Sequence, residues 1–301
     1  MVKVVTGGNG LVGSQFGPAY LKLGRKDADF TRRDVTIALL AKHAPHTVIH
    51  TAAKVGGLYS NLRAPADYFE QNLRINTNVL EACRLSGVKK MVAFLSTCIF
   101  PDAVEYPLTE EKIHLGPPHA SNYGYAYAKR MLEVGIQTHN QQHGTRYFCV
   151  IPTNIYGTHD NFNLNEAHVI PALIHKVFIA RENKTTLQIP GDGSALREFV
   201  FAPDVATIVE NLLEKYEQTS PLIISSGVEI SIKQVLEMII ELMNYDGKIE
   251  WQTQLTNGQH RKPSDISKLK SVLPDLQFTG IYHGLKQTVG WFEANYMDVR
   301  K

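Results

Sequence analysis

A tyrosine, a lysine and a serine in the first half of the chain are spaced so that they could catalyse proton transfer. Tyr125 and Lys129 lie four residues apart in "NYGYAYAKR", so a helix would place both on one face. Ser96 ends an apolar run that is typical of a strand. A nearby ammonium favours the phenolate form of a tyrosine, and a serine hydroxyl can hold a substrate oxygen. The alternative is an ordinary tyrosine–lysine pair on a surface helix. Tyr123 and Tyr127 could compete for the catalytic role, but neither has a lysine four residues further along the chain.

A cysteine follows the same serine. Cys98 comes just after the carboxyl end of the strand, where open α/β sheets place their sites. A thiol, with a usual pKa of about 8.5, can remove and return a proton beside a ketone if a second group works from another direction. Cys83 and Cys149 fit a helix face and a strand, so we expect both to be buried. Three cysteines without a CxxC pair predict neither disulfides nor a zinc site, and favour a reducing, cytoplasmic location.

A glycine-rich loop directly follows the first predicted strand, Val2–Val5. In "VVTGGNGLVGS" the glycines allow a tight turn and close backbone approach to a pyrophosphate. A plain turn is the alternative, which the position after a strand disfavours. We assign to cofactor binding Gly7, Gly10, Leu11, Val12 and Gly13, together with Ala52 and Ala53 at the end of a later strand.

The segment after this loop is unusually short. Only eleven residues separate Gly13 from Arg25, and Gly17 and Pro18 weaken any helix between them. Either the first helix and second strand are abbreviated, or the segment is incomplete. The residue that reads the cofactor ribose is expected near the end of that second strand. Because Arg25 and Lys26 stand there, we predict NADP(H) rather than NAD, although both could be solvated surface charges.

Strand-like and helix-like segments alternate through the first half of the chain. Strands are expected at Thr47–Ala53, Met91–Ser96 and Tyr147–Thr153, with helices between them that end at Gly87 and Gly144. Continuous apolar strands predict a doubly wound parallel sheet of the Rossmann type. After about residue 160 the strands shorten, and Ser231 is expected to cap a helix. We predict a cofactor domain over residues 1–159 and a smaller C-terminal α/β substrate lobe over residues 160–301, whose strands can interleave.

The composition excludes several partners. The chain has 301 residues, 20% of them charged, and a formal net charge of +2 without a basic block, so neither nucleic acid nor a membrane surface is predicted. Its apolar runs are shorter than the roughly 20 residues of a membrane-spanning helix. His43, His46 and His50 straddle a helix end and a strand without further ligands, so no metal is predicted.

Several longer motifs resemble one enzyme family. "STCIFP", "GPPH", "YGYAYAKR", "IPTNIYGTHDNFN" and "HVIPALIHK" are similar to the GDP-L-fucose synthase family of extended short-chain dehydrogenases/reductases. The resemblance runs nearly end to end. It implies a Rossmann enzyme that uses NADP(H) and a GDP-sugar, and a homodimer formed through helices around Phe69–Leu85 and Tyr125–Gln142.

The resemblance also implies roles for individual residues. The family converts GDP-4-keto-6-deoxy-D-mannose to GDP-L-fucose by inverting C3 and C5 and then reducing C4 with NADPH. Cys98 and His168 match the base and acid of the inversion, and Tyr125 matches the proton donor of the reduction. Lys129 and His168 are also assigned to cofactor contact. The residues assigned to the substrate are Asn154, Lys176, Arg197 and Lys262.

This chain departs from the family pattern at two positions. Lys176 stands where many members have arginine, which keeps the charge but loses the bidentate fork. Pro190 replaces a tryptophan before the glycine of "PGDGS". Two alternatives stay open: another nucleotide-sugar epimerase, dehydratase or reductase of this superfamily, or a cofactor-sensing or scaffold protein that kept the fold and lost the chemistry.

Overall fold

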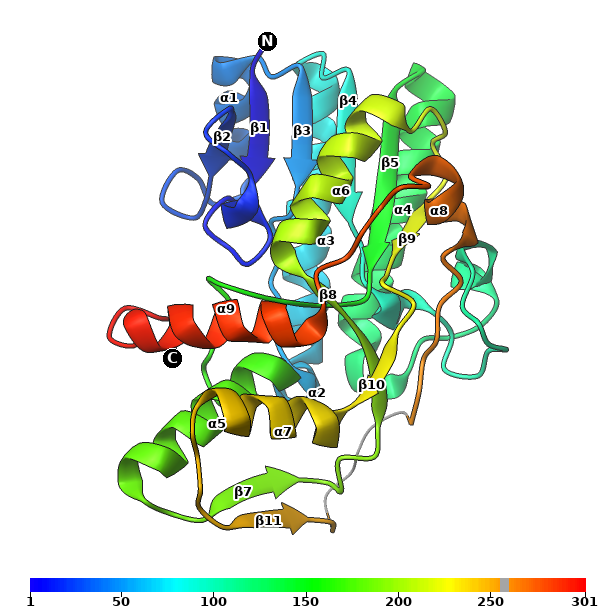
Figure 1. Ribbon diagram of the computed structural model, residues 1–301. Coiled ribbons are helices and arrows are strands. Elements are labelled where there is room, and N and C mark those ends of the chain that lie inside the picture. The colour runs from blue at the N-terminus through cyan, green and yellow to red at the C-terminus, as the bar shows by residue number, and fades with distance from the viewer. Residues whose placement is uncertain (255–259) are drawn as a thin grey trace.

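A six-stranded parallel sheet forms the larger part of the molecule (Figure 1). The computed structural model describes residues 1–254 and 260–301. The strand order is β2-β1-β3-β4-β5-β9, which confirms the predicted doubly wound α/β class. The strands are β1 (Lys3–Thr6), β2 (Tyr20–Leu23), β3 (Thr47–His50), β4 (Lys90–Phe94), β5 (Arg146–Pro152) and β9 (Leu222–Ile224).

Both faces of this sheet are covered because successive apolar residues point to opposite sides. Val4 packs in a core with helices from one face, and Val5 packs in a separate core with helices from the other. The first face carries α1 (Arg33–His43), α3 (Pro65–Leu85) and α4 (Tyr123–His143). The second carries α6 (Ala202–Lys215) and α8 (Ser267–Val272). Helix α4 ends at Gly144 with φ 64°, as predicted, and Gly87, just after α3, has φ 67°.

A smaller lobe lies beyond the carboxyl ends of the large sheet (Figure 1). It contains a three-stranded and a two-stranded sheet around a third core. The helix after Ser231 begins with a capping box, as its sequence predicts. The elements are β6 (Asn154–Tyr156), β7 (Leu187–Pro190), β8 (Leu196–Phe201), β10 (Glu229–Ser231), β11 (Ile249–Gln252), α5 (Val169–Asn183), α7 (Ile232–Leu242) and α9 (Ile281–Ala294). Helix α2 (Leu58–Arg63) and the short turns η1 (Gly13–Gln15), η2 (Thr97–Ile99), η3 (Glu110–His114) and η4 (Ala120–Asn122) join the larger elements.

The chain crosses between the two parts more than once. Strand β6 already belongs to the lobe, whereas β9, α6 and α8 return to the large sheet from beyond residue 160. The division at residue 159 therefore stays a prediction about which part binds the cofactor and which binds the substrate. The sequence analysis allowed for strands that interleave between the two parts.

The unit after the glycine loop is abbreviated but still completes the sheet edge. The expected first helix is reduced to the single turn η1, because Gly17 and Pro18 follow at once. All four residues of β2 pair in parallel with β1, from Lys3↔Tyr20 to Thr6↔Leu23. The short connection thus places the end of β2 beside the loop.

Candidate active site

The turn that carries Cys98 is held at both ends. Ser96 caps η2, and its Oγ accepts a bond from the Cys98 backbone N–H at 3.5 Å. On the other side, Arg130 Nε of α4 donates to the Ile99 carbonyl at 2.7 Å. The thiol of Cys98 is half-buried at the carboxyl end of the sheet, whereas Cys83 and Cys149 are buried, as expected.

Lys129 is fixed behind Tyr125 on the same helix, α4. Its Nζ donates to the Phe94 carbonyl at the end of β4 at 2.7 Å and lies 5.8 Å from the centre of the Tyr125 ring. Burial lowers the pKa of Lys129 to about 8, partly offset by its attraction to Cys98. The helical spacing thus brings the phenol, the ammonium and the end of β4 together, as the sequence predicts.

The sequence analysis expected Lys129 to favour the phenolate and so to lower the pKa of Tyr125. The structure contradicts this direction. Burial raises the pKa, and the nearby Cys98 and Tyr68 raise it further. The Tyr68 ring meets the Tyr125 ring edge-on at 6.4 Å, and its hydroxyl bonds to Ser60 Oγ at 2.6 Å. Desolvation outweighs the ammonium of Lys129 here. Tyr125 is therefore a neutral phenol, which suits a proton donor.

Opposing effects act on the thiol of Cys98. The net result is a raised pKa, because burial outweighs the hydrogen bond from Ser96 and the positive charges of Lys262 and Lys129, which lower it. Lys262 comes from a distant segment of the chain, so the fold adds a cation that strand and helix spacing did not predict. A cation beside a buried thiol favours the thiolate that a carbon base requires.

His168 is the residue before α5, and its segment packs against the loop that follows β3. The backbone N–H of Gly57 donates to the Glu166 carbonyl at 2.6 Å, and a Cβ on Gly57 would lie 2.5 Å from the Ala167 carbonyl oxygen. The His168 side chain reaches solvent, while surrounding protein lowers its pKa by desolvation. A neutral imidazole at this loop can accept or return a proton.

Of the predicted substrate residues, Lys262 interacts electrostatically with Cys98 and with Arg197. Asn154 Nδ2 donates to the backbone carbonyl of Glu198, the residue after Arg197, at 2.9 Å. These three predicted residues therefore share one region. Lys176 is instead on α5, beside a cavity of about 230 Å³ that β7 and β11 help to line.

Pro190 ends β7 and pairs with Gln252 of β11. An indole nevertheless packs against the turn that follows Pro190. A Cβ on Gly193 would come within 2.5 Å of the ring of Trp251, the β11 residue before Gln252.

The glycine loop has the close contacts that a cofactor cradle requires. Gly7 has φ 72°, and a Cβ there would lie 2.8 Å from the backbone nitrogen of Ala52. A Cβ on Gly13 would lie 2.3 Å from the Gly7 carbonyl oxygen. Leu11, Val12 and Ala53 belong to this loop and to the segment after β3. A backbone without side chains at these points fits a pyrophosphate.

The loop provides a matched pair of glycine substitutions. We expect Gly13→Ala to destabilise the fold by about 1–3 kcal/mol, because its Cβ meets backbone rather than a movable side chain. Gly17→Ala should be neutral, since a Cβ there meets nothing within 4 Å. Thermal unfolding and fluorescence titration with NADPH measure both variants. Equal behaviour of the two would contradict the tight packing of the loop.

Arg25 and Lys26 are exposed in the turn directly after β2. The turn lies against the glycine loop, because a Cβ on Gly24 would lie 2.9 Å from Asn9 Nδ2. Within the turn itself, the Gly24 N–H donates to Asp27 Oδ2 at 2.8 Å. Both cations are therefore placed where a ribose phosphate is expected.

Removing both cations should change cofactor preference. We expect Arg25→Ala with Lys26→Ala to raise the KM for NADPH about tenfold or more, since each charge-assisted hydrogen bond contributes about 1.5–3 kcal/mol. The KM for NADH should stay unchanged. Arg32→Ala, which removes an equally exposed cation paired with Asp34, is the control. An equal loss with both cofactors would rule out a role in reading the 2′-phosphate.

His50, the last residue of β3, is a structural histidine. The ring of His50 is buried between Thr6 Oγ1 at 2.8 Å and Asn76 Oδ1 at 3.2 Å, and burial lowers its pKa to about 3. Within residues 1–254 and 260–301, no cluster of three or more histidine, cysteine or acidic side chains could hold a metal ion. No helix in that described part is long and apolar enough to cross a membrane.

The sequence analysis missed Tyr68 and Glu198. Tyr68 packs on Tyr125, and Glu198 is a carboxylate with 3% exposure in β8. An acidic residue inside the apolar run "LREFVF" was the available signal for Glu198. Tyr68 offered none.

Comparison with known proteins now defines the class. A family model described as the NAD dependent epimerase/dehydratase family matches residues 3–225, so the chain belongs to that family and is an enzyme. The resemblance to GDP-L-fucose synthases is also confirmed over the whole chain. The chain is 44% identical to "GDP-L-fucose synthase" of Dictyostelium discoideum, in an alignment that covers 99% of this chain and 97% of that protein. It is 39% identical to "Probable GDP-L-fucose synthase" of Drosophila melanogaster, covering 99% of each.

Solved structures agree with this assignment. The crystal structure of a GDP-L-fucose synthetase from Naegleria fowleri has a TM-score of 0.93 and 38% identity, covering 100% of this chain and 95% of that one. A second structure of that protein is bound to NADP, with the same score and coverage.

Proposed function

We propose that this enzyme converts GDP-4-keto-6-deoxy-D-mannose to GDP-L-fucose with NADPH. The observation that carries the proposal is the position of Cys98. Its thiol follows Ser96 at the end of β4 and interacts electrostatically with Tyr125, Lys129 and Lys262. One site thus holds a thiol suited to carbon acids and a phenol suited to a ketone oxygen.

The ketone at C4 makes the protons at C3 and C5 acidic. Cys98 and His168 serve as base and acid, one taking a proton from carbon and the other returning one to the opposite face. Ser96 holds the C4 oxygen, and Tyr125 gives its proton to that oxygen while Lys129 compensates the phenolate that forms. NADPH supplies the hydride to C4 when bound. Asn154, Lys176, Arg197 and Lys262 hold the GDP-sugar.

We also propose that the enzyme is a homodimer. Helices α3 and α4 pack together, and both expose large apolar side chains: Phe69 on α3, and Tyr123, Met131 and Val134 on α4. Such unpaired apolar faces suit a helix–helix interface. A location in the cytoplasm, expected from the cysteine count, stays a prediction.

The function is tested by following the reaction in D₂O by NMR with NADPH present. Deuterium at C3 and C5 together with GDP-L-fucose supports both halves of the proposal. Consumption of NADPH without deuterium uptake would indicate a plain reductase. If NADPH does not bind, the proposed reduction at C4 fails and the scaffold alternative is favoured.

A further inference from the structure

The segment Arg261–Asp265, here called the anchored segment, is held from two sides. On one side it pairs with Leu108, whose N–H donates to the Pro263 carbonyl and whose carbonyl accepts from Asp265, both at 2.8 Å. On its other side it is bonded to the three-stranded sheet of the lobe, through Glu198 of β8 and Glu229 of β10. It therefore bridges the β4–α4 connection and the lobe.

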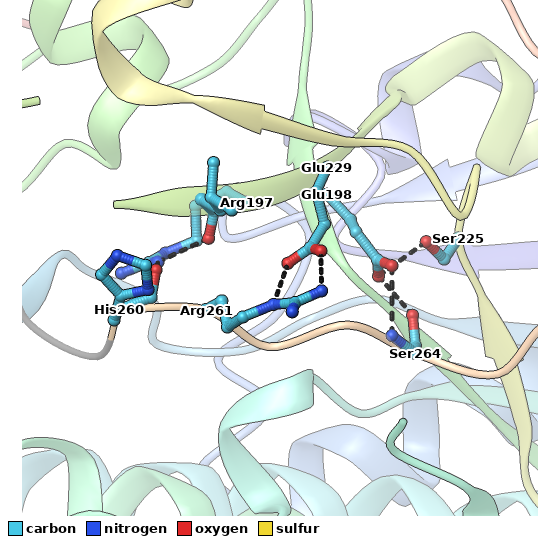
Figure 2. Close-up of polar contacts among 8 residues, drawn as sticks. Arg197, Glu198, Ser225, Glu229, His260, Arg261 and Ser264 are labelled. Carbon is cyan, nitrogen blue, oxygen red and sulfur yellow. Dashed lines mark hydrogen bonds and ion pairs between the residues drawn. The ribbon is translucent and has the colours of Figure 1, made fainter. Parts of the chain in front are cut away.

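The buried carboxylate of Glu198 in β8 attaches the anchored segment to the lobe (Figure 2). Its carboxylate accepts from the Ser264 N–H at 3.1 Å, from the Ser264 hydroxyl, and from the Ser225 hydroxyl at 2.9 Å. A second attachment lies nearer the surface, where Arg261 forms a two-pronged ion pair with Glu229. Glu198 thus joins the anchored segment to the segment after β9.

A carboxylate suits this position better than an amide. Three donors converge on its two oxygens, and an ionised carboxyl only accepts hydrogen bonds. A glutamine would turn its NH₂ group toward the two serine hydroxyls, which would have to change from donors to acceptors. The charge-assisted hydrogen bonds would be replaced by weaker neutral ones.

Lys262 lies between Arg261, which pairs with Glu229, and Ser264, which is bonded to Glu198. It interacts electrostatically with Cys98, Arg197 and Asp102. A lysine side chain is long and flexible, so its ammonium stays at one place only if its backbone is fixed. Leu108 and Glu198 fix the backbone that follows Lys262, and Glu229 holds Arg261 just before it.

We propose that Glu198 is a positioning residue that anchors the Arg261–Asp265 segment and so holds the Lys262 ammonium beside Cys98. The inference deepens the proposed function and rests on it for the role of Cys98 as a base. The charged groups that interact with the thiol include Lys262 from the anchored segment and both Lys129 and Arg130 from α4, with the neutral Tyr125 beside it.

The test measures the thiol without any substrate. The rate of alkylation of Cys98 by iodoacetamide is followed against pH by peptide mass spectrometry, and the buried Cys83 and Cys149 serve as internal references. We expect Glu198→Gln and Lys262→Met each to raise the apparent pKa of Cys98 by about 0.5 to 1 unit. The double variant should show no further shift, because Glu198 acts through Lys262.

Glu229→Gln is the matched control, since it removes the outer ion pair and leaves Glu198 intact. It should shift the Cys98 pKa less than Glu198→Gln does. A lower melting temperature of Glu198→Gln with an unshifted Cys98 pKa would mean a merely structural carboxylate and overturn the proposal. Additive shifts in the double variant would overturn it as well.

If Glu198→Gln does not fold, Ser264→Ala removes one donor of the same network and should give a smaller shift of the same sign. An unchanged pKa in that variant would count against the proposal. Failure of the proposed function is separate, since it would appear as absent turnover of the GDP-sugar with the thiol shifts still present.

Discussion

Tyr125→Phe is expected to slow the reduction at C4 by about 10²- to 10⁴-fold, because the C4 oxygen then lacks its proton donor. Inversion at C3 and C5 should continue, since the thiol of Cys98 and its cations are untouched. In D₂O the variant should therefore load deuterium onto the keto-sugar while NADPH absorbance falls only slowly. The phenol hydroxyl is the only group removed, and the ring that packs on Tyr68 stays.

Two neighbours on α4 provide matched controls. The rings of Tyr123 and Tyr127 pack against each other in a tilted arrangement with centroids 4.6 Å apart, and the guanidinium of Arg130 lies over the Tyr127 ring. Neither ring is next to Lys129. Phenylalanine at either position should leave reduction near the wild-type rate. If Tyr127→Phe slowed reduction as much as Tyr125→Phe, the assignment of the proton donor would be wrong.

Local spacing predicted the parts of the site that one element carries. Tyr125 and Lys129 share a helix face, and Ser96 and Cys98 follow one strand, so a single helix and a single strand end place all four. The fold class also predicted that these residues lie at one site, because open parallel sheets bind ligands at the carboxyl ends of their strands. For these residues the sequence was sufficient.

Burial and long-range contacts lay beyond the sequence. The direction of the Tyr125 pKa depends on how many atoms surround the phenol, which spacing does not reveal. Lys262 is 164 residues from Cys98 in the chain, and only the pairing of its segment with Leu108 and Glu198 brings the two together. The return of β9 to the large sheet is likewise a property of the topology.

Cys98→Ser should separate the two halves of the reaction in the opposite way. A serine hydroxyl occupies nearly the same space but is a far weaker acid than a thiol, so Lys262 and Lys129 cannot ionise it near neutral pH. We expect deuterium exchange at C3 and C5 to fall by about 10²- to 10⁴-fold. Ser96, Tyr125 and Lys129 remain, so the ketone can still be reduced without inversion.

The product then reports on Cys98 directly. NMR should find a GDP-6-deoxyhexose that keeps the substrate's configuration at C3 and C5, or unreacted keto-sugar if reduction requires the inverted form. Cys149→Ala is the control, since that thiol is buried in β5 opposite Ala93 of β4 and cannot reach a sugar. Wild-type exchange in Cys98→Ser would exclude the thiol as the base, and His168 would then have to serve both carbon centres.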